Sequence, residues 1–138
     1  MGTRPAGEVI HVSAALIVDD AGRLLVVRKR GTSVFMQPGG KPDPGESPAQ
    51  TLSRELAEEL GAIVPVDELE PLGSFTAAAA NEAGATVVAE VFRVRLSGPV
   101  AAAAEIAELR WIHPREFPTT ALAPLITEHM LALLGGPD

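Results

Sequence analysis

The pattern of apolar and polar residues predicts six strands and two helices along the chain. The strands are expected at residues 11–18, 24–28, 34–37, 72–79, 86–96 and 109–112. Turn residues at 19–22 and 81–84 separate neighbouring strands, so both pairs should form hairpins. Helices are expected at about 48–60 and 120–134. This order of elements predicts an α/β (α+β) fold, a mixed β-sheet flanked by two helices.

The first helix carries sequence signals at both of its ends. Ser47 is expected to cap its N-terminus, with Pro48 at the first helical position and Gln50 completing a capping box. Gly61 should end it. On a helical wheel the leucine stripe of this helix lies next to its acidic residues rather than opposite them. The acidic side chains should therefore lie at the edge of the buried face.

Three of these acidic residues share one side of the helix. Glu55, Glu58 and Glu59 have the spacing i, i+3, i+4, at which side chains are neighbours. Like charges at this spacing destabilise a helix by roughly 0.2–0.5 kcal/mol per pair, and a bound divalent cation would reverse that sign. Because the chain contains no cysteine, a thiolate metal site is excluded. Carboxylates and carbonyls suit Mg²⁺, with Mn²⁺ as a substitute.

The glycine-rich turn and this helix together fit a known motif, the Nudix box G-x5-E-x7-R-E-U-x-E-E-x-G-U, in which U is a bulky aliphatic residue. The matching positions are Gly40, Glu46, Arg54, Glu55, Leu56, Glu58, Glu59 and Gly61. The last position holds Ala62 and Ile63 follows it, which should alter packing but not chemistry. The chain thus resembles the Nudix family, and its order of elements resembles the Nudix α/β/α sandwich over almost its whole length.

Length, composition and charge restrict the classes of function. The 138 residues should form a single Nudix domain, residues 1–138, in which residues 1–8 are a loose N-terminal arm. With 46% hydrophobic residues, no cysteine, no charged leader and no long apolar run, we expect a soluble, cytoplasmic protein without a membrane partner. The formal charge of −7 argues against a nucleic-acid partner. An anionic substrate would need metal ions and local cations to offset that charge.

The resemblance implies a reaction and a metal site. In this family water attacks a phosphorus atom of a diphosphate linkage while Mg²⁺ neutralises the phosphate oxygens. By analogy Glu55, Glu58 and Glu59 would bind the metal, and the backbone carbonyl of Gly39 would add a ligand. Glu46 would bind metal through water or order the loop.

Further residues follow from the same resemblance. A glutamate several residues before the tryptophan-containing strand often completes the metal site or acts as base, and Glu105 lies six residues before Trp111. Glu108 is its competitor. Glu55 or Glu105 would accept the proton of the attacking water. Arg54 should orient a glutamate through an ion pair.

Contacts to the substrate are expected from basic and aromatic residues. Basic residues end the second predicted strand at 28–30, and one more lies in the glycine-rich turn. At least one should contact phosphate, and which one stays open because strand residues alternate between faces. The candidates for contact with phosphate are Arg28, Lys29, Arg30 and Lys41. The candidates for stacking on a base are the aromatic residues Phe35, Phe75 and Phe117.

The identity of the substrate is less constrained. Pro-Gly-Gly before the box and Glu-Phe-Pro at 116–118 resemble the MutT-like branch, which hydrolyses nucleoside triphosphates, including oxidised dGTP, to monophosphate and pyrophosphate. Members that read the oxidised purine tend to carry an asparagine after Phe-Pro. Residues 119–122 here are Thr-Thr-Ala-Leu, so strict selectivity for 8-oxo-purines is not expected.

Other substrates and functions stay open. The ADP-ribose branch typically has a proline near the position of Ala77, and the dinucleoside-polyphosphate branch a tyrosine, which this chain lacks. A nucleotide-sugar hydrolase and a non-catalytic nucleotide-sensing module are further alternatives, although the box has lost none of its carboxylates. Many small Nudix proteins pair through a sheet edge, so a homodimer is also an open expectation.

Overall fold

The computed structural model describes residues 7–80, 83–113, 115–116 and 121–135, and its strands form two sheets. A four-stranded sheet has the order β3-β1-β5-β4, and a smaller sheet pairs β2 with β6. Strands β1 and β5 are parallel and the other pairs are antiparallel, so the larger sheet is mixed. The strands are β1 (Val9–Ile17), β2 (Leu24–Lys29), β3 (Gly39–Gly40), β4 (Glu70–Ala78), β5 (Thr86–Val94) and β6 (Ile106–Ile112).

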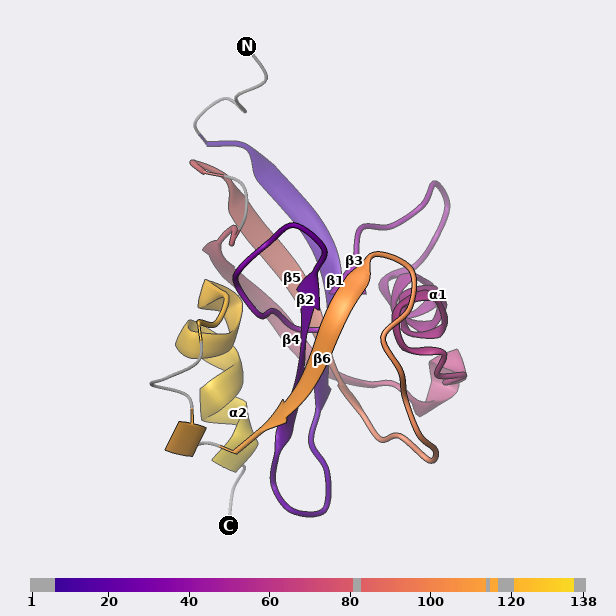
Figure 1. The fold of residues 1–138 in the computed structure, drawn as a ribbon. Coiled ribbons are helices and arrows are strands. Elements are labelled where there is room, and N and C mark those ends of the chain that lie inside the picture. The colour runs from indigo at the N-terminus through magenta and orange to yellow at the C-terminus, as the bar shows by residue number, and fades with distance from the viewer. Residues whose placement is uncertain (1–6, 81–82, 114, 117–120, 136–138) are drawn as a thin grey trace.

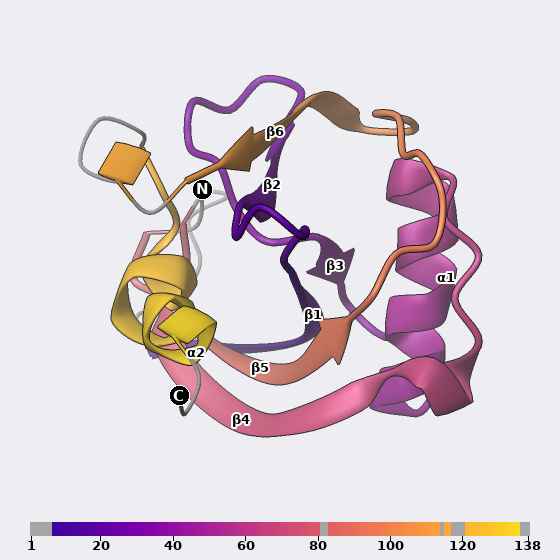
Figure 2. The same cartoon turned by 90° about the horizontal axis from the view of Figure 1, so that it is seen from below.

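Helices lie on opposite sides of these sheets, as Figures 1 and 2 show. On one side is α1 (Pro48–Leu60), and on the other is a C-terminal helix made of a π-helical stretch, η3 (Ile126–Met130), and α2 (Leu131–Gly135). A short 3₁₀ turn, η1 (Val66–Glu68), follows α1. The predicted fold class, a mixed sheet flanked by helices, is confirmed. Among the described residues no helix is long and apolar enough to cross a bilayer.

The core has two parts because β1 and β2 are buried on both faces. Alternate residues of β1 point to opposite sides, so Ala15 and Ile17 pack toward α1 while Ala14 and Leu16 pack toward the C-terminal helix. Strand β2 divides in the same way. The first part of the core is closed by three leucines of α1, Leu52, Leu56 and Leu60. The second part is closed by residues of the C-terminal helix, Leu125, Ile126 and Met130.

One of the two predicted hairpins is correct and the other is wrong. Strands β4 and β5 pair antiparallel around the predicted turn. Strands β1 and β2, however, belong to different sheets, and a single bridge between Val18 and Leu24 joins them next to their turn. Beyond that bridge the strands diverge, because each buries both of its faces and finds its partners elsewhere, β1 in β5 and β3, and β2 in β6.

The C-terminal helix begins later than predicted. Residues 121–123 are extended and flank Phe35: the Phe35 N–H donates to the carbonyl of Ala121 at 2.9 Å, and the Ala123 N–H donates to the carbonyl of Phe35 at 2.8 Å. Helical structure starts at Pro124, which disfavours helical dihedrals in the residue before it. Strand β6 also starts earlier, at Ile106 instead of residue 109. Most of the predicted N-terminal arm lies outside the described residues.

Candidate active site

The acidic helix begins and ends where its caps predict. The Ser47 side chain accepts a hydrogen bond from the Gln50 N–H at 3.2 Å, and the Ser47 N–H donates to Gln50 Oε1 at 2.9 Å, which completes the capping box. Gly61 ends the helix in the left-handed conformation with φ of 69°. The leucine stripe is fully buried. This packing fixes the rotation of α1 and therefore the depth of each of its carboxylates.

The deepest carboxylate belongs to Glu59, whose exposed fraction is 2%. Its Oε1 accepts a hydrogen bond from the Gly39 N–H at 3.1 Å. Burial raises the pKa of Glu59 to about 8, although the hydrogen bond from Gly39 acts in the opposite direction. Glu59 is thus a buried acid at the point where the helix meets β3.

Glu55 lies one turn earlier, against the same loop. Burial is the main cause that raises its pKa, and the neighbouring guanidinium of Arg54 lowers it. A Cβ at Gly40 would collide with the Glu55 carboxylate, and a Cβ at Gly39, whose φ is 141°, would collide with the backbone of β1. Glycine is therefore required at position 39, and at position 40 it lets the loop lie directly against the Glu55 carboxylate.

Glu58 occupies a different environment, since 53% of its side chain is exposed. Its carboxylate lies 3.5 Å from Nη1 of Arg54. Among the described residues, no three acidic or histidine side chains already converge in the geometry of a metal site. The helix brings the three glutamates to one side, as predicted, but at three different depths.

Arg54 connects the helix to the glycine-rich loop. Its Nε donates to Glu46 Oε2 at 2.7 Å, and its Nη2 donates to Glu46 Oε1 at 3.0 Å and to the carbonyl of Lys41 at 3.1 Å. Nη1 lies 3.2 Å from Glu55. The hydrogen bonds from Arg54 hold the pKa of Glu46 at about 2. These contacts tie Glu46 to the loop, and its other predicted role, binding metal through water, stays a prediction.

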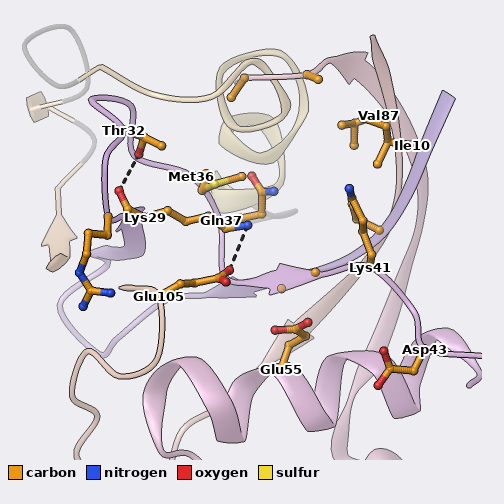
Figure 3. A pocket seen from close by; sticks show the side chains of 16 residues that line it. Ile10, Lys29, Thr32, Met36, Gln37, Lys41, Asp43, Glu55, Val87 and Glu105 are labelled. Carbon is orange, nitrogen blue, oxygen red and sulfur yellow. Dashed lines mark hydrogen bonds and ion pairs between the residues drawn. The ribbon is translucent and has the colours of Figure 1, made fainter. Parts of the chain in front are cut away.

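A cavity of about 600 Å³ adjoins the carboxylates, between the glycine-rich loop, β1, β5 and the start of β6. Figure 3 shows Ile10 and Val87 across this cavity from Glu55 and Glu105. Its charged lining residues are Lys29, Arg30, Lys41, Asp43, Glu55 and Glu105. Its apolar lining residues are Ile10, Val12, Met36, Ala79, Ala80 and Val87. Thr32, Gln37, Gly39 and Gly40 complete the lining. The cavity therefore combines charged and apolar surface.

The predicted phosphate-binding residues separate into two groups. Lys29 and Lys41 line the cavity, and Lys29 Nζ pairs with Glu105 at 3.2 Å. Arg28 does not line it: this side chain donates to Glu108 at 3.3 Å and to the carbonyl of Thr32 at 2.9 Å. The alternation of strand residues, which left the choice open, thus directs Arg28 away from the cavity.

The same division separates the two candidate glutamates that precede Trp111. Glu105 lines the cavity and is 56% exposed at its side chain. Glu108 instead pairs with Arg28 and, at 3.1 Å, with Arg110, and hydrogen bonds from these arginines lower the pKa of Glu108. The cavity therefore contains Glu105 and not its competitor.

Of the predicted aromatic residues, the two that the structure describes, Phe35 and Phe75, do not line the cavity. Phe35 is buried in the core, and the guanidinium of Arg110 lies 4.6 Å from the centre of its ring. Phe75 packs against His129. Phe117 lies outside the described residues. Sequence reasoning missed the apolar lining and Gln37, although Gln37 directly precedes the Pro-Gly-Gly turn and could have been suspected from that position.

The donor set at the helix fits a hard divalent cation. Burial raises the pKa of both Glu55 and Glu59, which means that the ionised carboxylates are destabilised in this environment. Positive charge close to them would stabilise the ionised forms. An ion with two charges would supply it, and carboxylate and carbonyl oxygens are the ligands that Mg²⁺ and Mn²⁺ favour.

Comparison with known proteins agrees with the geometry. Residues 9–134 match the model of the NUDIX domain. A MutT-like protein from Streptomyces ambofaciens is 34% identical over 104 residues, which cover 75% of this chain and 63% of that protein. An 8-oxo-dGTP diphosphatase from Haemophilus influenzae is 38% identical over 66 residues, 45% of this chain and 48% of that protein. The matches thus span about half to two thirds of the length of these relatives.

Solved structures give the same result. A NUDIX hydrolase from Nitrosomonas europaea is similar with a TM-score of 0.75 and 25% identity, over 94% of this chain and 90% of that one. The chain therefore belongs to the NUDIX family, and the family prediction made from the box is confirmed.

Proposed function

We propose that this protein hydrolyses a nucleoside triphosphate to a monophosphate and pyrophosphate, or a related nucleoside diphosphate derivative to a monophosphate and a second phosphorylated product, in a reaction that requires Mg²⁺ or Mn²⁺. The observation that carries the proposal is the position of Glu55, which lies both beside the buried Glu59 and on the wall of the cavity. The cavity, about 600 Å³, falls within the usual range for small-molecule sites.

The names of two relatives support a nucleotide as the substrate class. One is a MutT-like protein and the other an 8-oxo-dGTP diphosphatase. A MutT-like activity on damaged triphosphates would give this protein a part in cleaning the nucleotide pool.

Charge at the cavity supports a polyphosphate substrate. The protein carries a formal charge of −7, so a triphosphate would be repelled unless positive groups lay close to it. Lys29, Arg30 and Lys41 all line the cavity next to the carboxylates. We assign the phosphate-binding role to these three residues, and give Arg28 a structural role beside Glu108.

The reaction needs a proton acceptor and a correctly placed helix. Water would attack phosphorus, the bond to the leaving phosphate would break, and the water proton would pass to a carboxylate. Glu55 and Glu105 both line the cavity and are the two candidates for that base. Arg54 would hold the glutamates of α1 in position. A cation bound by Glu55, Glu58, Glu59 and the Gly39 carbonyl would supply charge neutralisation and a lower pKa for the attacking water.

The first test changes one box carboxylate. Glu58→Gln should lower kcat by at least about 100-fold with Mg²⁺ present, because an anionic ligand is lost. Glu128→Gln is the matched control, since Glu128 is exposed on the C-terminal helix and does not line the cavity. Unchanged turnover in Glu58→Gln would overturn the catalytic assignment.

The second test identifies the substrate. Ordinary and oxidised nucleoside triphosphates, ADP-ribose, nucleotide sugars and dinucleoside polyphosphates would be incubated with the protein and Mg²⁺, and the products separated. We expect monophosphate and pyrophosphate from a triphosphate. A clear preference for ADP-ribose would overturn the choice of branch, and activity that survives EDTA would overturn the metal requirement.

A further inference from the structure

Gln37 has a polar atom that the fold itself does not satisfy. Its side chain lies on the cavity wall and is 9% exposed, and its Oε1 is buried without a hydrogen-bond partner among the described residues. Buried polar atoms are paired in the great majority of cases, so an exception calls for an explanation. Oε1 of Gln37 is the only such side-chain atom found in the described part of the chain.

The cavity wall around Gln37 includes both charged and apolar residues, among them Lys29 and Met36. Figure 3 shows its amide beside Met36, with Ile10 and Val87 farther along the same cavity. Ile10 and Val87 are partners in the register of β1 and β5, so both side chains lie on one face of the sheet. Gln37 therefore adds an unpaired hydrogen-bonding atom to a cavity that also has apolar surface, as expected for a site that holds a flat heterocycle by its faces and reads one edge.

The backbone holds Gln37 in this position. Its neighbour Met36 pairs with Val27 of β2, with N···O distances of 2.8 and 2.7 Å, and on the other side the carbonyl of Pro38 accepts from Ala15 of β1 at 2.9 Å. The residue is thus fixed between two strands that belong to different sheets. A backbone held this firmly is preorganised, and it loses little conformational entropy when a ligand binds.

We propose that Gln37 determines base specificity: its amide oxygen accepts a hydrogen bond from an exocyclic amino group of the substrate's nucleobase. This inference rests on the proposed function, because it concerns the base of the same nucleotide. Oε1 is buried and unpaired in the free protein, so a base that brings an amino group to it satisfies an acceptor that otherwise has no hydrogen bond. A base without the amino group leaves Oε1 unsatisfied, and such a substrate is discriminated against.

The test uses pairs of nucleotides that differ in one amino group. The pairs are the triphosphates of adenosine and purine riboside, of cytidine and 2-pyrimidinone riboside, and of guanosine and inosine. We expect the wild-type kcat/KM to favour the amino-bearing member of at least one pair by roughly 10- to 100-fold. In Gln37→Met, which keeps the length of the side chain but has no amide acceptor, that ratio should fall to about one.

Two further variants separate specificity from folding. Met36→Leu changes the neighbouring apolar side chain on the same cavity and should keep the wild-type ratio. Gln37→Leu also removes the acceptor, so its kcat/KM ratio within each nucleotide pair should fall to about one, as in Gln37→Met. Both Gln37 variants should melt at or above the wild-type temperature, because a buried group without a partner has been removed. A ratio that stays at its wild-type value in folded Gln37→Met and Gln37→Leu would overturn the proposal.

A binding measurement keeps this inference separate from the hydrolytic function. Calorimetry with the monophosphates of the same pairs requires no cleavage. If no nucleotide is hydrolysed but the amino-bearing monophosphates bind more tightly and Gln37→Met abolishes that preference, the specificity assignment stands and the hydrolytic proposal falls. If hydrolysis proceeds with equal kcat/KM within every pair, the assignment of Gln37 falls and the hydrolytic proposal stands.

Discussion

Arg54 shows how much one side chain can organise at the scale of single residues. Its guanidinium contacts Glu46 and the Lys41 carbonyl on the loop, and Glu55 and Glu58 on its own helix. Each of its three nitrogens has at least one acceptor, which uses the planar fork that distinguishes arginine from lysine. Arg54 therefore fixes both the position of the loop and the orientation of two carboxylates.

The loss of Arg54 should therefore reduce activity without a direct contact to substrate. We expect Arg54→Ala and Arg54→Lys to lower kcat/KM by about 10- to 100-fold and to raise the Mg²⁺ concentration needed for half-maximal rate. The measurement is a metal titration of the rate. Arg23→Ala, in a turn paired only locally with Asp19, is the control and should behave like wild type. Full activity in Arg54→Lys would show that charge alone suffices.

The partner of Arg54 gives a pH prediction. Since its hydrogen bonds with Arg54 lower the pKa of Glu46 from 4.5 to about 2, the native state favours the ionised carboxylate. A depressed carboxyl pKa contributes stability that is fully present above the unfolded pKa and is lost as pH falls toward the native pKa. The difference in melting temperature between wild type and Glu46→Gln should be constant above about pH 5.5 and shrink between about pH 4.5 and 2. A difference that does not change over this range would contradict the assignment.

At the scale of elements, α1 and the C-terminal helix differ in how far the sequence could predict them. Both ends of α1 depend on local signals, Ser47 with Gln50 and then Gly61, and its bounds match the prediction. The predicted start of the C-terminal helix was wrong. Residues 121–123 instead form hydrogen bonds with Phe35, which lies far away in the sequence. Helical spacing of apolar residues cannot reveal a competing extended partner at that separation.

The cap of α1 is a measurable part of its stability. Ser47→Ala removes the acceptor for the Gln50 N–H and half of the capping box, so the free energy of unfolding should fall by about 1 kcal/mol. Urea denaturation followed by circular dichroism measures this change. Ser97→Ala, at an exposed position after β5, is the matched control and should change stability by less than about 0.5 kcal/mol. Equal loss in both variants would mean that the cap contributes nothing specific.

At the scale of the whole molecule, the two-part core places α1 and the C-terminal helix on opposite sides of the sheets. The cavity lies where strands of the larger sheet meet the loop that crosses from β2 to α1, and its lining comes from segments between residues 10 and 105. The burial of Glu59 is a property of this whole arrangement, since Gly39 and α1 must both be in place to enclose it.

Metal binding should therefore stabilise the entire fold. An ion that binds the native state alone adds about 2.7 kcal/mol at 100 times its dissociation constant, so Mg²⁺ or Mn²⁺ should raise the melting temperature by several degrees and EDTA should reverse the rise. Differential scanning calorimetry measures the shift. Glu59→Gln should lose most of it, whereas the control Glu128→Gln should keep it. An identical shift in Glu59→Gln would place the ion elsewhere.

The sequence by itself determined the family, the bounds of α1, the common side of Glu55, Glu58 and Glu59, and the mixed fold, because these follow from signals within a few residues of one another or from a contiguous motif. Only the tertiary structure decided which residues face the cavity. It separated Lys29 from Arg28 and Glu105 from Glu108, buried Phe35 in the core, and left the amide oxygen of Gln37 without a partner. The physical reason is that a strand's partners, and hence the direction and burial of its side chains, are chosen by contacts between distant segments.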